Sequence, residues 1–165
     1  MQRSDISILV LRIVFGVFLS WHGVNKVRNG IDGTAGWFGS IGMKWPRAQA
    51  WTAAVTEIGA GALFAAGFLT PIAAAGIIGT MIVAIVTVHW RVGFFIFLPN
   101  GGWEYCASIA VVAAAVAWSG AGDASVDGWL GTTEGSAWGA TGVLLGLAGA
   151  VAHLAFSWRR PEVQK

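Results

Sequence analysis

Charged residues are scarce in this sequence. Only 11% of its 165 residues are Asp, Glu, Lys or Arg, whereas 56% are hydrophobic. A soluble domain has about 25% charged residues, and a chain this short exposes much of its surface to the surrounding solvent. The composition therefore excludes an ordinary soluble domain. The same high apolar content excludes an intrinsically disordered chain.

Cysteine is nearly absent, and the excess of positive charge is small. The single cysteine, Cys106, excludes an internal disulfide, a CxxC redox pair and any multi-cysteine metal or cluster site. The net charge of +2 provides no basic stripe for nucleic acid, so we expect no such partner. No cleavage site of small residues follows the first apolar run, and we interpret that run as retained rather than as a secretory signal.

Long apolar stretches are what the sequence has in abundance. A membrane-spanning helix needs about 20 apolar residues, and five stretches come close: 6–26, 48–68, 71–90, 103–119 and 138–158. We therefore predict an all-α membrane protein with a four-helix transmembrane bundle over residues 1–119. An acidic, Gly-rich extracytoplasmic loop, which we expect to be mobile, follows over 120–137. A fifth transmembrane helix with a basic cytoplasmic tail completes the chain over 138–165.

Tryptophans support these limits. Six of them fall near predicted helix ends, where indole rings favour the headgroup level: Trp51, Trp90, Trp103, Trp118, Trp138 and Trp158. Two further segments contain large apolar residues: in 29–49 they lie among glycines and a few charges, and 94–99 is apolar but too short to span. We expect them to lie on the bilayer surface.

Lysine and arginine are divided unevenly between the two sides of the predicted bundle. If the helices alternate in direction, one side holds eight basic residues: Lys26, Arg28, Lys44, Arg47, Arg91, Arg159, Arg160 and Lys165. The other side holds one basic residue and four acids: Arg3, Asp5, Asp123, Asp127 and Glu134. Because basic residues accumulate in cytoplasmic loops, we expect the N-terminus outside and the C-terminus in the cytoplasm.

Alternation of the helices also brings ionisable side chains into one half of the bilayer. The members of this group come from the first four predicted helices: His22, Lys26, Glu57, His89, Glu104 and Tyr105. Glu57 lies about nine residues into the second helix, or roughly 13 Å below the surface. A carboxylate at that depth is protonated, paired or turned towards a polar cavity. The six residues therefore predict a polar pocket that holds a ligand or moves protons.

Each of these residues also has a purely structural interpretation. Glu104 complements a helix dipole, Lys26 snorkels to the surface, and the two histidines form hydrogen bonds at the interface. In the opposite leaflet, we expect Arg12 to pair with Asp5 or with a lipid phosphate. In the fifth helix the spacing of small residues indicates close packing, with His153 assigned to the same packing role: Gly139, Gly142, Gly146 and Gly149.

Several motifs together resemble the DoxX family of small bacterial membrane proteins. They span about residues 8–118: Trp21-His22-Gly23-Val24-Asn25-Lys26, Gly36-Trp37-Phe38 with Ile41-Gly42, Glu57-Ile58-Gly59 with Gly67-Phe68-Leu69-Thr70, Val88-His89, and Gly102-Trp103-Glu104-Tyr105. The resemblance implies a multi-pass protein of the bacterial cell membrane that is tied to redox metabolism. Relatives include the membrane subunit of thiosulfate:quinone oxidoreductases. The six pocket residues all fall within these motifs, whereas the fifth helix lies beyond them.

The preferred function is a quinone-linked membrane subunit that receives electrons from other membrane or peripheral redox subunits, rather than a stand-alone enzyme. Either His22 or His89, together with Tyr105, would donate hydrogen bonds to the two quinone carbonyls. Glu57 and Glu104 would relay protons. No metal and no covalent cofactor is expected.

Three alternatives remain open. The first is a non-catalytic anchor or accessory subunit that uses the fifth helix and the acidic loop as contact surfaces. A haem b subunit ligated by His22 and His89 is less favoured. A carrier for small solutes or protons is the last, although the chain is short and has no evident internal repeat.

Overall fold

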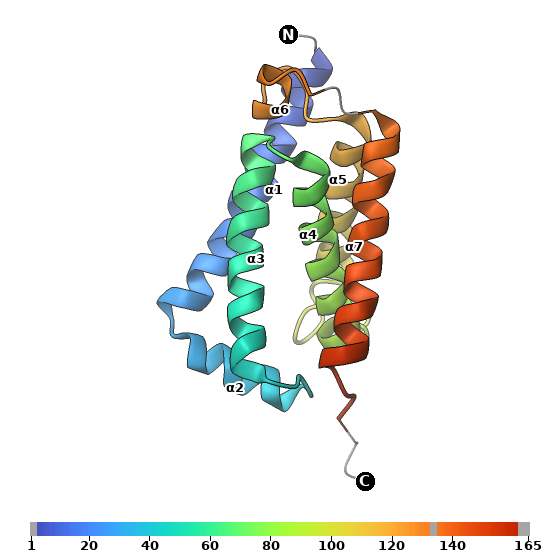
Figure 1. Ribbon diagram of the computed structural model, residues 1–165. Helices are drawn as coiled ribbons and strands as arrows, with labels where there is room; N and C mark the ends of the chain where they lie inside the picture. Colours follow the sequence, from blue (N-terminus) through green and yellow to red (C-terminus); the bar gives the residue numbers. More distant parts are fainter. Residues whose placement is uncertain (1–2, 133–134, 162–165) are drawn as a thin grey trace.

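The computed structural model describes residues 3–132 and 135–161, and within these ranges every regular element is a helix. This confirms the predicted all-α class. The elements are α1 (Arg3–Arg28), α2 (Ile31–Ser40), α3 (Pro46–Ala66), α4 (Thr70–Ala84), which continues as the π-helix η1 (Ile85–His89), α5 (Glu104–Ser119), α6 (Val126–Trp129) and α7 (Ser136–Ser157). The five long helices α1, α3, α4, α5 and α7 form one bundle, and Figure 1 shows α6 at one end of it and α2 at the other.

Three of the helices are long and apolar enough to cross a bilayer: Ser4–Arg28, Thr70–His89 and Ser136–Ser157. α5 is apolar but only 16 residues long. α3 is 21 residues long, but polar side chains, among them Gln49 and Glu57, interrupt its apolar sequence. Length and composition thus support membrane association, and they leave α3 and α5 below the usual criterion for a crossing.

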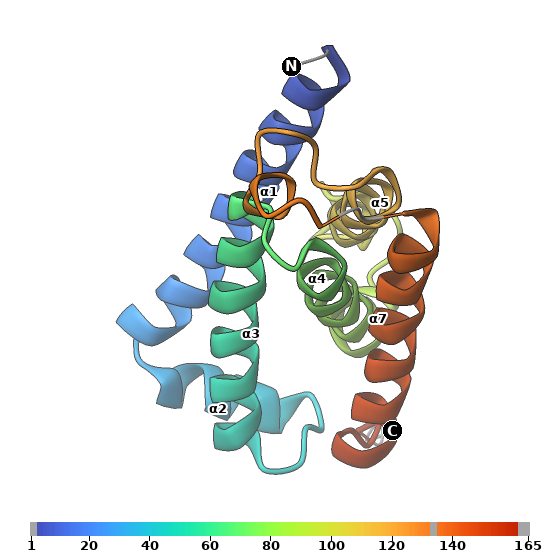
Figure 2. The same ribbon diagram turned by 45° about the horizontal axis from the view of Figure 1, so that its top comes forward.

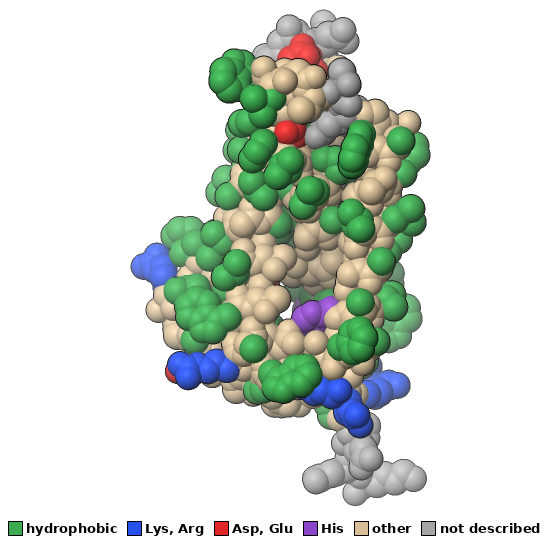
Figure 3. All heavy atoms as spheres, viewed as in Figure 1, with side chains coloured by type: hydrophobic (Ala, Val, Ile, Leu, Met, Phe, Trp, Pro, Cys, Tyr) green, Lys and Arg blue, Asp and Glu red, His purple; other side chains and the backbone are tan. Residues whose placement is uncertain are grey.

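The outer surface of the bundle is apolar. Large side chains such as Phe18, Val111, Leu144 and Phe156 are each more than 60% exposed. Figure 3 shows such side chains spread over the visible face between the two ends. Contiguous apolar surface of this extent is unfavourable in water. It is the surface that a protein embedded in lipid requires.

α1 and α3 approach closely through glycine. A Cβ atom on Gly16 would lie 2.5 Å from the carbonyl oxygen of Gly61, and one on Gly23 would lie 2.7 Å from that of Ala54. No side chain fits at either position, so the two backbones approach more closely than larger residues would allow. This contact fixes which residues of α1 and α3 face each other.

α7 packs against α4 and α5 in the same way at three glycines. A Cβ atom there would overlap the backbone of a neighbouring helix: Gly139 with Ala117, Gly142 with Pro71, and Gly146 with Ala75. Gly149 differs from the packing role predicted for it. It is exposed, and no atom of another helix lies within 4 Å of the position its Cβ would occupy.

The segment 120–137, expected to be a loop, contains the short helix α6 and is hydrogen-bonded to the bundle through Asp127. Asp127 is 3% exposed and accepts three hydrogen bonds at the start of α4. Its Oδ1 accepts one from the Leu69 amide (2.9 Å), and its Oδ2 accepts two from the amide (3.0 Å) and hydroxyl (2.8 Å) of Thr70. Figure 2 shows α6 at the end of α3, next to the turn that leads to α4. This carboxylate therefore connects α6 to the turn between α3 and α4.

Arg12 strengthens the same end of the bundle. Its side chain is 1% exposed, and its Nη2 donates a hydrogen bond to the carbonyl oxygen of Ala124 at 2.6 Å. The expected contact with a lipid phosphate is wrong, because the buried guanidinium is out of reach of lipid. Its role is structural, as the sequence indicated.

At the opposite end, the connection between α2 and α3 is bonded to the end of α7. The Lys44 amide donates to the carbonyl oxygen of Ser157 (2.8 Å), and the Arg159 amide donates to that of Gly42 (3.0 Å). Gly42 has φ = 89°, and a Cβ atom there would overlap the carbonyl oxygen of Arg159. Only glycine therefore allows this approach. The segment 29–49, expected at the bilayer surface, contains the helix α2.

Replacement of Asp127 tests the connection through α6. We expect Asp127→Ala to lower the free energy of unfolding by about 3 kcal/mol, because it leaves buried donors of Leu69 and Thr70 without their charged acceptor. Denaturation of the purified protein in mixed detergent micelles measures this change. The control is Asp123→Ala, at an exposed carboxylate in the same segment. Equal stability of the two variants would contradict this role.

Candidate functional site

A cavity of about 910 Å³ lies inside the bundle, between α3 and α7. All five long helices, η1 and the α2–α3 connection contribute to its wall, which is mostly apolar. In Figure 3 it is visible as a hollow between α3 and α7, with a histidine side chain at its lower edge. Its opening faces the apolar side surface of the bundle rather than one of the ends. Such an opening suits a lipophilic molecule that enters from the bilayer.

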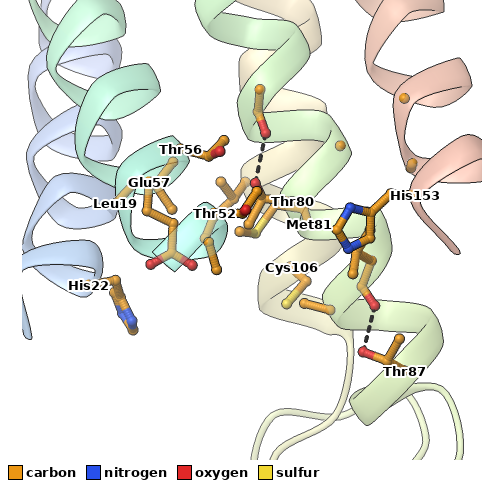
Figure 4. A pocket seen from close by; sticks show the side chains of 18 of the residues that line it. Leu19, His22, Thr52, Thr56, Glu57, Thr80, Met81, Thr87, Cys106 and His153 are labelled. Atoms are coloured by element: carbon orange, nitrogen blue, oxygen red, sulfur yellow. Dashed lines mark hydrogen bonds between the residues drawn. The ribbon is translucent and has the colours of Figure 1, made fainter. Parts of the chain in front are cut away.

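The first polar pair of the cavity joins α1 to α3. The Lys26 Nζ donates to Glu57 Oε2 at 2.5 Å, and the Glu57 side chain is 7% exposed. The close approach of α1 and α3 at Gly23 brings the two residues together. Lys26 therefore neutralises a buried carboxylate instead of only extending to the surface. His22 lies one turn before Lys26 and lines the same wall of the cavity (Figure 4).

The second polar pair joins η1 to α5. The Nδ1 of His89 lies 2.8 Å from the carbonyl oxygen of Gly101, and its Nε2 lies 2.7 Å from the Tyr105 hydroxyl. Because a carbonyl oxygen only accepts, Nδ1 carries the proton and Nε2 accepts from Tyr105. The wider π-helical turn Ile85–His89 ends at this histidine, and such turns occur frequently at functional sites.

Glu104 is separated from the other five residues of the predicted cluster. It does not line the cavity, and its Oε2 accepts a hydrogen bond from the Ile96 amide at 3.1 Å. The prediction that Glu104 belongs to the pocket is thus not met, because the first turn of α5 directs it towards the loop at 94–99. The remaining five residues all line the cavity: His22, Lys26, Glu57, His89 and Tyr105.

Several polar residues of the cavity were not predicted from the sequence. They are Gln49, Thr52, Thr56, Thr80, Thr87, Cys106 and His153. On α3 a signal was present, because residues 49, 52, 53, 56 and 57 follow the i, i+3, i+4, i+7, i+8 spacing of one helix face. His153, which was assigned to packing, projects from α7 into the same space (Figure 4). The glycines of the same helix had indicated packing against a neighbour, and for that reason His153 was not predicted to line a pocket.

The histidines do not fit the haem hypothesis. Both ring nitrogens of His89 have hydrogen-bond partners, Gly101 and Tyr105. An axial ligand needs a free ring nitrogen, and His89 as placed offers none to iron. The arrangement instead suits transfer of protons between hydrogen-bonded groups.

Residues 7–90 match the family model named DoxX. The chain belongs to the DoxX family. The match confirms the resemblance drawn from the motifs, and it includes His22, Lys26, Glu57 and His89. The part of this DoxX chain that contains α5, α6 and α7 lies outside the match.

A protein of Bacillus subtilis (strain 168), named "Putative oxidoreductase CatD", is 34% identical to this DoxX chain over 106 residues. The aligned part covers 64% of this chain and 75% of the relative. No solved structure matches the sequence. The comparisons thus relate the chain to the DoxX family and to a relative whose name describes a putative oxidoreductase.

Removing one partner of the buried pair tests its electrostatic role. We expect Lys26→Met to lower the free energy of unfolding by about 3 kcal/mol, because the Glu57 carboxylate then loses its countercharge inside the bundle. The double variant Lys26→Met/Glu57→Gln should recover part of this loss. Unfolding in mixed micelles measures both changes.

The matched control is Arg47→Met, which breaks the ion pair of Arg47 with Asp32, whose side chains are 72% and 76% exposed. Exposed pairs contribute less than about 1 kcal/mol. Losses of equal size for Lys26→Met and Arg47→Met would contradict the buried electrostatic role.

Proposed function

We propose that this chain is the membrane subunit of a quinone-linked oxidoreductase and that the cavity binds the quinone. The observation that supports this most directly is that one mostly apolar cavity contains two hydrogen-bonded acid–base pairs, Lys26–Glu57 and Tyr105–His89. A quinone has the same character, with two polar carbonyl oxygens on an apolar body. Its isoprenoid tail would leave through the opening between α3 and α7, past Ile72 and Leu145.

Hydrogen-bond donors are available for both carbonyl oxygens. The Lys26 ammonium group is one donor, because it has N–H groups beyond the one that it gives to Glu57. The Tyr105 hydroxyl becomes the other when His89 is protonated, because Nε2 then donates to the Tyr105 oxygen and leaves the hydroxyl hydrogen for the carbonyl. Lys26 also supplies positive charge next to an oxygen that gains negative charge on reduction. Thr52 and Thr56 add further hydroxyls on the wall formed by α3.

The two pairs also provide places for the protons. Oxidation of a quinol releases two electrons and two protons. Tyr105 would take up one proton at its oxygen while it passes its own to Nε2 of His89, and the Glu57 carboxylate would accept the other. Reduction of a quinone reverses these transfers, starting from protonated His89 and Glu57. The electrons would go to or come from a separate redox protein, because the single Cys106 cannot form a thiol–disulfide couple within the chain.

We further propose that α1, α3, α4, α5 and α7 all cross the membrane, with the N-terminus outside and the C-terminus in the cytoplasm. One end of the bundle, here called the basic end, holds seven of the eight basic residues assigned to the cytoplasm: Lys26, Arg28, Lys44, Arg47, Arg91, Arg159 and Arg160. Lys165 and Glu134 lie outside the described residues. The end with α6 holds Asp123 and Asp127, and Figure 3 shows acidic side chains at this end.

Titration of the purified protein with decylubiquinone tests the quinone site. We expect Tyr105→Phe to weaken binding about tenfold, because it removes one hydrogen-bond donor from the cavity. We expect a similar loss for Glu57→Gln, which weakens the attraction that holds Lys26 in place. Quenching of tryptophan fluorescence measures both affinities.

The matched control for these variants is Glu104→Gln, the same substitution at a glutamate outside the cavity, which should bind like the wild type. Absence of quinone binding in the wild type would contradict the proposal and favour a non-catalytic anchor. Equal weakening in all three variants would indicate a general loss of structure.

Labelling of single cysteines tests the orientation. In a Cys106→Ala background, we expect Asp123→Cys to react with a membrane-impermeant maleimide added to intact cells. We expect Arg47→Cys to react only after the membrane is permeabilised, because the basic end faces the cytoplasm. The reverse pattern would contradict the proposed orientation.

A further inference from the structure

Besides the cavity, a groove of about 540 Å³ lies at the basic end of the bundle. It is formed by the end of α2, by η1 with the turn that follows it, and by the segment after α7. Its lining residues are Ser40, Ile41, Val86, Thr87, Val88, Trp90, Arg91, Trp158, Arg160 and Pro161. The groove shares Ile41, Thr87 and Val88 with the large cavity but none of the ionisable side chains of that cavity.

The charge of this groove is entirely positive. Among residues 3–132 and 135–161, Arg91 and Arg160 are the only ionisable ones that line it. Within residues 3–132 and 135–161, neither arginine forms an ion pair, whereas Arg47 and Lys26 each have a carboxylate partner. Two guanidinium groups that share a groove without a countercharge in this part of the chain form a site for an anion.

Hydrogen bonds hold in place the two chain segments that carry these arginines. Trp158 Nε1 donates to the carbonyl oxygen of Ile41 (2.8 Å), which fixes the segment that leads to Arg160. The amide of Trp90 donates to the carbonyl oxygen of Ile85 (2.7 Å), which fixes the turn before Arg91. The two arginines thus come from segments far apart in the sequence that the fold ties to the same end.

We propose that this groove binds the phosphate group of an anionic phospholipid. Guanidinium groups bind phosphate oxygens in pairs, and basic pockets at the ends of membrane helices bind anionic headgroups. Trp90 and Trp158 are the aromatic residues expected at headgroup level. Val86 and Val88 continue the wall towards the apolar part of the bundle, where an acyl chain would lie.

Native mass spectrometry of the protein with added dioleoyl phosphatidylglycerol or dioleoyl phosphatidylcholine tests the proposal. We expect the wild type to bind phosphatidylglycerol about tenfold more tightly than phosphatidylcholine. The double variant Arg91→Gln/Arg160→Gln should bind both lipids equally. Because both arginines are exposed, the double variant should keep the thermal midpoint of the wild type, and this measurement separates loss of the site from loss of the fold.

The control for net charge is the double variant Arg28→Gln/Arg47→Gln, which removes two positive charges at the same end but outside the groove. It should retain the preference for phosphatidylglycerol. An equal loss of preference in both double variants, or retention of the preference in Arg91→Gln/Arg160→Gln, would overturn the proposal.

Inorganic phosphate distinguishes a lipid headgroup from a free anion. Competition by millimolar phosphate that displaces phosphatidylglycerol completely would overturn the lipid assignment, whereas retention of the lipid would support it. The proposal is independent of the quinone site, since Glu57 does not line the groove. Glu57→Gln should therefore bind phosphatidylglycerol like the wild type, whatever its effect on quinone binding.

Discussion

The structure depends on one constraint: a charge inside an apolar bundle requires a partner. Glu57 meets this requirement through Lys26, and the two residues meet because glycines allow α1 and α3 to approach closely. Lys26 bonds to only one carboxylate oxygen, Oε2, and Glu57 remains on the wall of the cavity. The interaction that makes a buried acid tolerable thus also makes it available for chemistry.

Both ends of the bundle help to shape the cavity. At one end, Asp127 holds α6 onto the start of α4, and Arg12 is buried beneath the same segment. At the other end, the α2–α3 connection is hydrogen-bonded to the last residues of α7. Between these two ties, α3 and α7 border an opening towards the apolar side surface. Polar groups inside the bundle and an opening on its apolar side surface therefore occur together.

Helical spacing and depth predicted five of the six pocket residues, because depth depends only on position along a helix. The missing one, Glu104, has the expected depth, but its side chain turns to the Ile96 amide. The direction of a side chain around the helix axis was likewise not predictable. His153 points into the cavity instead of packing against a helix, and Gly149 faces away from the neighbouring helices. The attachment of residues 120–132 to the bundle was not predictable, because the Asp127 hydrogen bonds join residues 57 or 58 positions apart.

The sequence by itself determined the all-α class, the membrane environment, the family and the set of polar residues at similar depth, since these follow from composition, periodicity and motifs. Only the tertiary structure decided which of these residues meet, that His89 donates to Gly101 and accepts from Tyr105, and that Arg91 and Arg160 share a groove. The reason is physical. Contacts between helices depend on their rotation and closest approach, which are set by backbone packing between segments distant in the chain.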